Sequence, residues 1–436
     1  RRAGGVPGAW GALPDKSLYV ITPVAAVLQA NALGILTMTF VYVSSLFLLP
    51  SVALGVVTPL LTTIAARQTE EVGRIIGGMH ALAALGSITG VFLTGYLLVQ
   101  YFGTRQVVFG VSILLLLLCI PYLVRERAVR GATALAVLLG VAIVTTLSYS
   151  NLFAKTCKVE SAYYCINVVD RTPDVTFGVA RGLVLDHLLH GINHMNEPGY
   201  LVGAFAQGID ELVFAQFEAD YHDNLRYFFA GGGSYTLPRT IKATDHTAQI
   251  TVAEIDPEVT AISARELDVD PGDFTVIHQD ARVALAAETG EFDVIVTDVF
   301  HDISIPYHLV TREFAALVRE KLSARGIYLM NVVDQFPDPR LVKSIVKTLA
   351  LEFAHVGVWM DHVPKDPTRF TYVISAANES ALPDEVLARR GLDRGWLNVR
   401  VAIDEIGTPV DNLPVLTDSY APVERLMSGL LTGAAR

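Results

Sequence analysis

The sequence predicts a multi-helix transmembrane domain followed by an α/β domain with a parallel sheet, and two observations carry this prediction. Long uncharged apolar tracts fill the first 150 residues, and from about residue 156 short apolar strands alternate with helical segments and glycine turns. Apolar residues make up 52% of the 436-residue chain, which is high for a purely soluble protein. We expect a transmembrane domain at 1–152, a small β-hairpin domain at 153–202 and the parallel-sheet domain at 203–436.

The apolar tracts are long enough to cross a lipid bilayer. A spanning helix needs about 20 predominantly apolar residues, and no Lys, Arg, Asp or Glu occurs in four tracts, at 17–66, 75–104, 106–124 and 131–154. The first tract has room for two crossings. The sequence therefore predicts about five helices and a multi-pass location in the inner plasma membrane, with helices near 17–36, 38–66, 76–101, 106–124 and 131–151.

The charges in the short loops indicate on which side of the membrane the α/β domain lies. Arg67 and Arg74 flank one loop, and Arg125, Arg127 and Arg130 lie in another. The positive-inside rule places both loops in the cytoplasm and the α/β domain outside. The ligand expected below is made in the cytoplasm, which favours the opposite side, so the sequence leaves the side open.

The two parts differ in net charge. Residues 1–150 carry nine Lys/Arg and four Asp/Glu, a net of +5, and the whole chain carries −11, so the remainder carries −16. An acidic α/β domain argues against a nucleic-acid partner. We expect membrane lipid and small molecules as partners; a homo-oligomer such as a dimer is expected from the family resemblance given below.

Three cysteines are present, and none has zinc-type spacing. Cys119 lies in an apolar tract and is expected to be a packing residue. Cys157 and Cys165 have seven residues between them and form either a hairpin disulfide, in an oxidising compartment, or two half-buried thiols. His187, His190 and His194 lack a carboxylate or cysteine that would complete a ligand set. We therefore predict no metal.

Strand and helix patterns follow one another in a regular order after residue 156. The runs at 163–170 and 182–189 predict a small antiparallel sheet. Five further strands alternate with helices, which predicts a Rossmann-like sheet of the methyltransferase type, covered on both faces. The strands are expected at 225–230, 249–256, 273–281, 292–300 and 326–333, and the helices at 258–268, 281–288 and 311–322.

The first four of these strands end in residues that can bind a nucleoside. Ligands of such sheets bind at the carboxyl ends of the strands, and a carboxylate there can accept two hydrogen bonds from a ribose diol. The alternative is that the glycines form a plain tight turn and the acidic residues are solvated strand ends. Four such ends in succession disfavour this alternative. The strand ends are Gly231, Gly232 and Gly233, then Glu254 and Asp256, then Gln279 and Asp280, then Asp298.

The three glycines are not a GxGxxG pattern, and no phosphate site at a helix start is evident. The sequence therefore predicts a nucleoside without a pyrophosphate, such as S-adenosylmethionine or a relative.

These motifs together resemble the spermidine synthase family of polyamine aminopropyltransferases, and more closely its membrane-fused bacterial group. The resemblance covers roughly residues 156 to 426. It is carried by GGGSYTLPR, VAEIDPEV, HQDAR, FDVIVTDVF and IPYHLVTREF, with ESAYYCINVVD and LVLDHLLHG upstream and LTDSYAPVERL near the C-terminus.

The resemblance implies a role for individual residues. Glu254 would bind the ribose hydroxyls, Asp280 with Ala281 would meet the adenine amino group, and Asp298 would be the catalytic base. Asp302 would help to attract a polyamine. The other residues expected around the nucleoside are Gly231, Gly232, Gly233, Ser234, Tyr235, Ile255, Asp256, Gln279, His190 and Tyr200.

The chain also departs from the family pattern. Soluble members have GGGDG where this chain has Ser234 and then Tyr235, and Leu201 replaces a histidine after Tyr200. The DVFHD run replaces the usual acidic motif after the fourth strand, and it introduces His301 as a second acid–base candidate beside Asp302. The nucleoside half of the site is therefore expected to be retained and the amine half to be rebuilt.

Three functions follow as expectations. The first is a membrane-anchored transferase that uses decarboxylated S-adenosylmethionine or S-adenosylmethionine, moves an aminopropyl-type group to an amine and releases methylthioadenosine. The second is an enzyme that cleaves or cyclises S-adenosylmethionine without an external amine. The third is a non-catalytic nucleoside-binding scaffold. His308, after the fourth strand, is expected to be structural, capping or orienting its loop.

Overall fold

The structure is a computed structural model, and the chain divides into two compact units, Arg1–Thr156 and Cys157–Arg436. This division lies close to the predicted end of the transmembrane domain at residue 152. The structure describes residues 35–67, 72–125, 157–186, 188–221, 223–300, 304–389 and 394–428.

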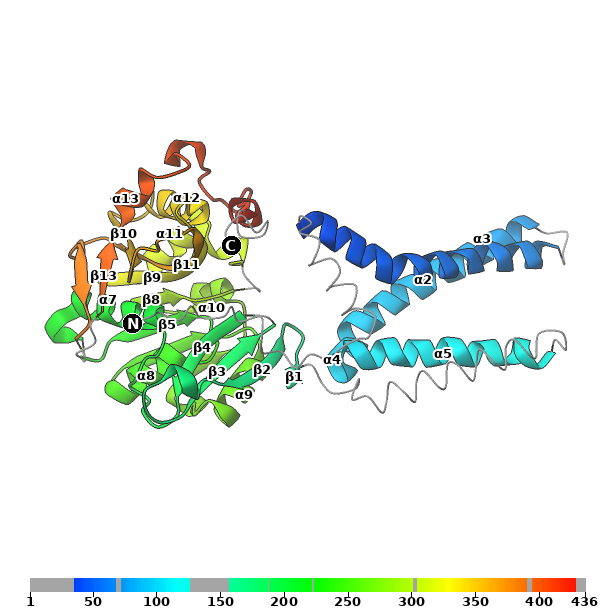
Figure 1. Cartoon of the computed structure of the whole chain (residues 1–436), viewed down its shortest axis with the longest axis horizontal. Helices are drawn as coiled ribbons and strands as arrows, with labels where there is room; N and C mark the ends of the chain where they lie inside the picture. Colours follow the sequence, from blue (N-terminus) through cyan, green and yellow to red (C-terminus); the bar gives the residue numbers. More distant parts are fainter. Residues whose placement is uncertain are drawn as a thin grey trace. The chain divides into compact units, whose positions relative to one another are not determined.

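The described part of the first unit is helical (Figure 1). One continuous stretch, Val72–Leu98, is long and apolar enough to cross a membrane. The predicted helix at 131–151, and all but the last two residues of the one at 17–36, lie outside the described residues. The five-helix membrane domain therefore stays a prediction. The elements are α2 (Ile35–Ala66), α3 (Val72–Leu93), the π-helical turn η2 (Thr94–Leu98), α4 (Val99–Phe102) and α5 (Thr104–Arg125).

The second unit is built on a nine-stranded sheet in the order β12-β13-β10-β11-β9-β8-β5-β6-β7. The five strands from β9 to β7 are parallel, and the four from β11 to β12 are antiparallel. The sheet is therefore mixed, whereas the sequence predicted only its parallel half. The strands are β5 (Arg226–Ala230), β6 (Gln249–Ala253), β7 (Thr275–Ile277), β8 (Phe292–Thr297), β9 (Leu322–Phe336), β10 (His355–Met360), β11 (Thr368–Ala377), β12 (Glu385–Leu387) and β13 (Gly395–Asn398).

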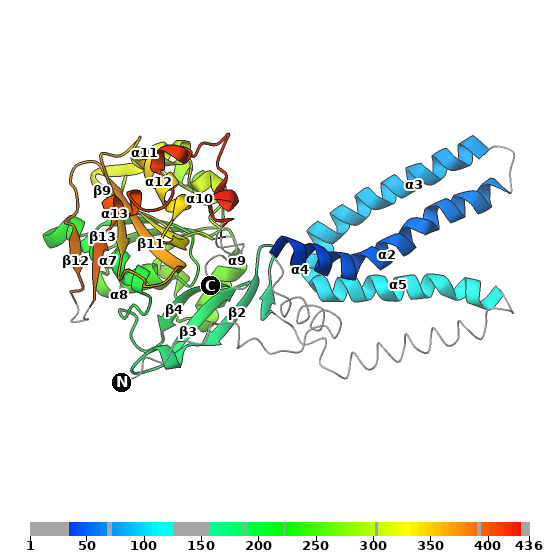
Figure 2. The same cartoon turned by 45° about the horizontal axis from the view of Figure 1, so that its top comes forward.

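Helices cover both faces of this sheet (Figures 1 and 2). Alternate side chains of β5 enter opposite cores: Phe228 packs with α10, α11 and α12, and Tyr227 and Phe229 pack with α7, α8 and α9. Burial on both faces explains why this strand is a continuous apolar run. The helices are α7 (Ala204–Phe217), α8 (Thr236–Thr244), α9 (Pro257–Glu266), α10 (Ala281–Ala287), α11 (Arg312–Lys321), α12 (Arg340–Leu349), α13 (Arg400–Asp404) and α14 (Val423–Leu426).

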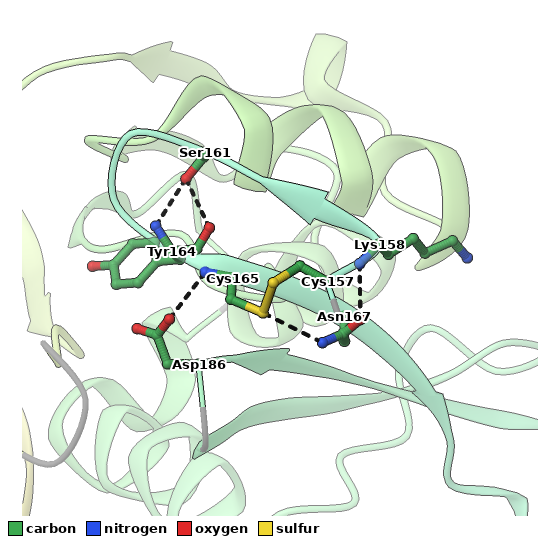
Figure 3. Close-up of a disulfide and its surroundings, with 7 residues drawn as sticks. All are labelled: Cys157, Lys158, Ser161, Tyr164, Cys165, Asn167 and Asp186. Carbon is green, nitrogen blue, oxygen red and sulfur yellow. Dashed lines mark hydrogen bonds between the residues drawn. A yellow bond between two sulfur atoms is a disulfide. The ribbon is translucent and has the colours of Figure 1, made fainter. Parts of the chain in front are cut away.

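A separate four-stranded antiparallel sheet precedes the large one. Its order is β1-β2-β3-β4, with β1 (Val159–Glu160), β2 (Cys165–Asp170), β3 (Ala180–Leu185) and β4 (Leu188–His194). The predicted antiparallel sheet is thus present, with a short β1 added at its edge. A disulfide joins Cys157 to Cys165 across the β1–β2 hairpin (Figure 3), which decides between the two alternatives that the sequence left open.

Candidate active site

The central cavity of the second unit lies where the strand order reverses. Strand β5 stands between β6 and β8, so the chain moves in one direction along the sheet after β5 and in the opposite direction after β7. Crevices form at such a point, outside the carboxyl ends of the strands. The cavity has a volume of ≈ 200 Å³, and residues from the ends of β5, β6 and β8 line it, including Gly231, Glu254 and Asp298.

The glycine loop is shaped by backbone conformations that favour glycine. Gly231 has φ +95° and Gly233 has φ +51°. A Cβ atom on Gly231 would lie 2.5 Å from the carbonyl oxygen of Asp298, so the loop after β5 and the loop after β8 approach closely only without that side chain.

The Glu254 carboxylate holds this loop in place. Its Oε2 accepts hydrogen bonds from the backbone N–H groups of Gly232 (2.9 Å) and Gly233 (3.2 Å), and its Oε1 accepts one from Asp256 (2.9 Å). Burial raises the pKa of Glu254, and these three backbone donors oppose that effect. Each carboxylate oxygen can accept more than one hydrogen bond, so the cavity side of Glu254 can still accept from a ligand hydroxyl.

Asp298 is a buried carboxylate with few partners. The amide Nδ2 of Asn331 on β9 donates to its Oδ1 at 2.9 Å. Burial raises the pKa of Asp298 from 3.8 to about 6, and the Asn331 hydrogen bond only partly opposes this. A carboxylate with a pKa near 6 is suited to general base catalysis near neutral pH.

A smaller cavity adjoins the central one behind the glycine loop. The two share His190, Gly231, Gly233 and Asp298, and the smaller one has a volume of ≈ 30 Å³. Burial lowers the pKa of His190 to about 4, so its imidazole is neutral at physiological pH. Its Nε2 has no hydrogen-bond partner among the described residues. The other lining side chains of the smaller cavity are mainly apolar and include Phe205.

The disulfide-linked hairpin contributes the wall of the central cavity opposite the sheet. Tyr163 and Tyr164, between β1 and β2, line the cavity. The hydroxyl of Ser161 donates to the carboxylate of Asp256, and the Tyr164 hydroxyl donates to the carbonyl of Phe300 at 3.4 Å. Ser161 also accepts from the Tyr164 N–H at 2.9 Å (Figure 3), so this turn is fixed internally and to the large sheet.

Most residues predicted for the nucleoside site meet in the central cavity, and five do not. Ser234 lines the smaller cavity, where its hydroxyl pairs with that of Thr236 at 2.7 Å. The predicted residues that do line the central cavity are His190, Gly231, Gly233, Glu254, Ile255, Gln279, Asp280, Ala281 and Asp298.

The remaining four lie around these cavities. Gly232 lines only the smaller cavity, and the Tyr235 ring is buried beneath that glycine with its hydroxyl bonded to Thr260. Asp256 caps α9 through the N–H of Glu258. Tyr200 lines a different cavity of ≈ 350 Å³. Its ring packs against Phe177 and His194 there, which keeps it away from Asp298.

Two catalytic candidates, His301 and Asp302, lie outside the described residues. Within the described ranges, no group of three or more His, Cys, Asp or Glu side chains is arranged to hold a metal ion.

No protein-family model matches the chain. Pairwise similarity is nevertheless clear. The chain is 29% identical over 213 residues to a probable polyamine aminopropyl transferase of Bifidobacterium longum, covering 45% of this chain and 47% of that protein. It is 35% identical over 105 residues to the polyamine aminopropyltransferase of Vibrio vulnificus, covering 23% of this chain and 34% of that protein. The resemblance to polyamine aminopropyltransferases is confirmed.

The fold is also that of this enzyme group. A crystal structure of a probable spermidine synthase from Corynebacterium glutamicum superposes with a TM-score of 0.52 at 19% identity, covering 60% of this chain and 95% of that one. The chain spans about half the length, or less, of the two aminopropyltransferases named above. Likeness to the membrane-fused group stays a prediction.

Several of the side chains that line the two cavities were not predicted from the sequence. Tyr164 and His308 line the central cavity, and Phe205 lines the smaller one. Tyr164 lies in a hairpin motif that the sequence did single out, so its ring offered a signal. Phe205, the second residue of α7, offered none.

Proposed function

We propose that the second unit is a transferase that binds decarboxylated S-adenosylmethionine or S-adenosylmethionine and moves an aminopropyl-type group to an amine. One observation carries this proposal: Glu254 and Asp298, at the ends of the two strands that flank β5, line the same cavity. Glu254 is placed to accept hydrogen bonds from a ribose, and Asp298 is a buried base with a pKa of about 6. The names of the similar proteins support the same reaction class.

The reaction balances with these groups. The amine lone pair attacks the propyl carbon bonded to the sulfonium sulfur, a new C–N bond forms, and the C–S bond breaks. The bonding pair goes to sulfur, which leaves as the neutral thioether methylthioadenosine. Asp298 accepts the proton that the amine nitrogen loses. The chain otherwise needs only to align the two substrates, since the sulfonium is a good leaving group.

Ser234 motivates a second candidate. It stands where soluble family members carry an aspartate, and its hydroxyl is engaged with Thr236. The tail of the nucleoside therefore meets a neutral group at that point. The candidate is an S-adenosylmethionine-cleaving enzyme that uses no external amine. An oxygen or nitrogen of the nucleoside's own tail attacks the tail carbon bonded to the sulfonium sulfur, so a ring forms as the C–S bond breaks and methylthioadenosine leaves. A nucleoside-binding scaffold without catalysis is the third outcome that the experiment below separates.

We also propose that the first unit anchors the enzyme in the inner membrane. The stretch Val72–Leu98 supports this by its length and apolar composition. The loop charges and the Cys157–Cys165 disulfide favour an exterior second unit, and a nucleoside made in the cytoplasm favours the interior. Protease digestion of sealed cells distinguishes the two, because only an exterior unit would be cut from outside.

Methylthioadenosine release, measured by mass spectrometry, tests the reaction. The purified full chain is given each nucleoside, with and without a panel of polyamines, beside Asp298→Asn and the surface control Asp273→Asn. Release that requires both a polyamine and Asp298 supports the transferase. Release without an amine supports cleavage. Binding without release from either nucleoside would refute both enzymatic functions.

A further inference from the structure

The carboxylate of Asp280 is already committed to contacts within the protein. Its Oδ1 accepts hydrogen bonds from the backbone N–H groups of Arg282 (3.0 Å) and Val283 (3.1 Å) and so caps α10. Its Oδ2 bonds to Nε2 of His308 at 2.7 Å. Asp280 and His308 both line the central cavity.

This contact fixes the hydrogen-bonding character of His308. A carboxylate only accepts, so Nε2 of His308 must carry the proton that it donates to Asp280. In a neutral imidazole the other nitrogen, Nδ1, is then an acceptor. Together the two side chains present only acceptor atoms beyond their own contact. The feature of a nucleobase that complements these acceptors is an exocyclic amino group, because it brings two N–H donors.

We propose that His308, oriented by Asp280, determines base specificity: the pair reads the 6-amino group of the adenine ring, and His308 is more than a structural residue of its loop. This inference rests on the nucleoside site proposed above. A 6-oxo purine would place an acceptor oxygen against the same acceptors and would leave them without hydrogen bonds, which disfavours its binding.

The C-terminal segment holds the loop that carries His308. The carboxylate of Asp418 accepts two hydrogen bonds from the Arg282 guanidinium, at 2.7 and 2.8 Å, and one from the Thr311 hydroxyl at 2.7 Å. Arg282 also donates to the backbone carbonyl of His308 at 3.2 Å. Asp418 lies in the LTDSYAPVERL motif. These hydrogen bonds make Asp418 a positioning residue that acts on the base through Arg282 and His308.

Binding of two nucleosides to the full chain tests the proposal. Methylthioadenosine carries the 6-amino group, and methylthioinosine carries a carbonyl oxygen in its place. Calorimetric Kd values for both are compared across wild type, His308→Ala and His308→Gln. Glutamine is the matched control, because its amide can donate to Asp280 and still offer an acceptor.

We expect the wild type to prefer methylthioadenosine, His308→Ala to lose about tenfold of that preference, and His308→Gln to keep most of it. Asp418→Asn should reduce the preference by a smaller factor in the same direction. The ratio of the two Kd values is the readout, since a general loss of packing would weaken both nucleosides alike. An unchanged ratio in His308→Ala, or equal losses in the Ala and Gln variants, would overturn the role of His308.

The failure of the underlying site has a different signature. A wild type that binds neither nucleoside overturns the nucleoside site and the base-reading pair together. A wild type that binds methylthioadenosine tightly but does not discriminate between the two bases overturns only the base-reading pair.

Discussion

Replacing Asp298 by asparagine should stabilise the second unit at neutral pH while it strongly slows the reaction. Burial raises the pKa of this carboxyl from 3.8 to about 6, so the folded protein holds the proton more tightly than the unfolded chain does. Such a group contributes stability at low pH and loses it as the pH rises through the folded pKa. The side chain that serves as a base is therefore expected to lower the free energy of unfolding at working pH.

The size of the effect follows from the two pKa values. Each pH unit between them corresponds to about 1.4 kcal/mol. Between pH 4 and pH 8 the wild type should lose about 2.5 kcal/mol of unfolding free energy through Asp298, and Asp298→Asn should not. The variant keeps the shape of the site, and its amide can pair with Asn331, whose Oδ1 has no partner among the described residues. Its activity should fall about 10²- to 10⁴-fold, as expected on loss of a general base.

Urea unfolding of the full chain in detergent measures this effect. The fluorescence of Trp359 and Trp396, both buried in the second unit, reports its unfolding. The stability difference between Asp298→Asn and wild type should grow from pH 4 to about pH 6 and level off above that. Asp273→Asn, at an exposed carboxylate, should give a flat difference. A flat profile for Asp298→Asn as well would refute the assignment of Asp298 as a buried carboxylate with a raised pKa.

Three further perturbations have defined outcomes. Replacing Cys157 and Cys165 by serine opens a loop of about nine residues, which should cost about 2.6 kcal/mol of hairpin stability and weaken nucleoside binding. Hydrogen exchange in the hairpin and the Kd of methylthioadenosine measure these two effects, and unchanged exchange would contradict the prediction. Gly231→Ala should destabilise the unit by about 1–3 kcal/mol, because its φ of +95° disfavours a side chain; an unaltered thermal midpoint would count against this. Glu254→Gln replaces one oxygen that accepts backbone N–H groups with a donor. Binding of methylthioadenosine, measured by calorimetry, should therefore weaken at least about tenfold. An undiminished affinity would show that Glu254 does not belong to the site.

The sequence was most informative where the signal is local. Apolar runs, the glycine triplet and the carboxylates after successive strands placed five parallel strands and three of the helices between them. The same reasoning brought Gly231, Glu254 and Asp298 to one edge of the sheet, and the structure places all three on one cavity. This works because parallel strands joined by helices must align their carboxyl ends, so a residue's position in its strand fixes its position in space.

The antiparallel half of the sheet was missed because its pairing is a tertiary choice. Strand β11 pairs with β9 along ten residues, from Thr368 with Phe336 to Ala377 with Ile327. An apolar strand has the same pattern whether its neighbour is parallel or antiparallel. Its direction depends on the connection that leads into it, because a parallel neighbour needs a crossover and an antiparallel one does not.

The amino-acid sequence by itself determined the five strands of the parallel half, the polar groups at its edge and the resemblance to aminopropyltransferases. Only the tertiary structure decided which distant segments complete the site. Tyr164 reaches Phe300 from 136 residues away, His308 donates a hydrogen bond to Asp280, and Tyr200 lines another cavity. These contacts depend on how the hairpin and the loops pack on the sheet. No periodicity along the chain encodes such packing, because it is set by the shapes that meet after folding.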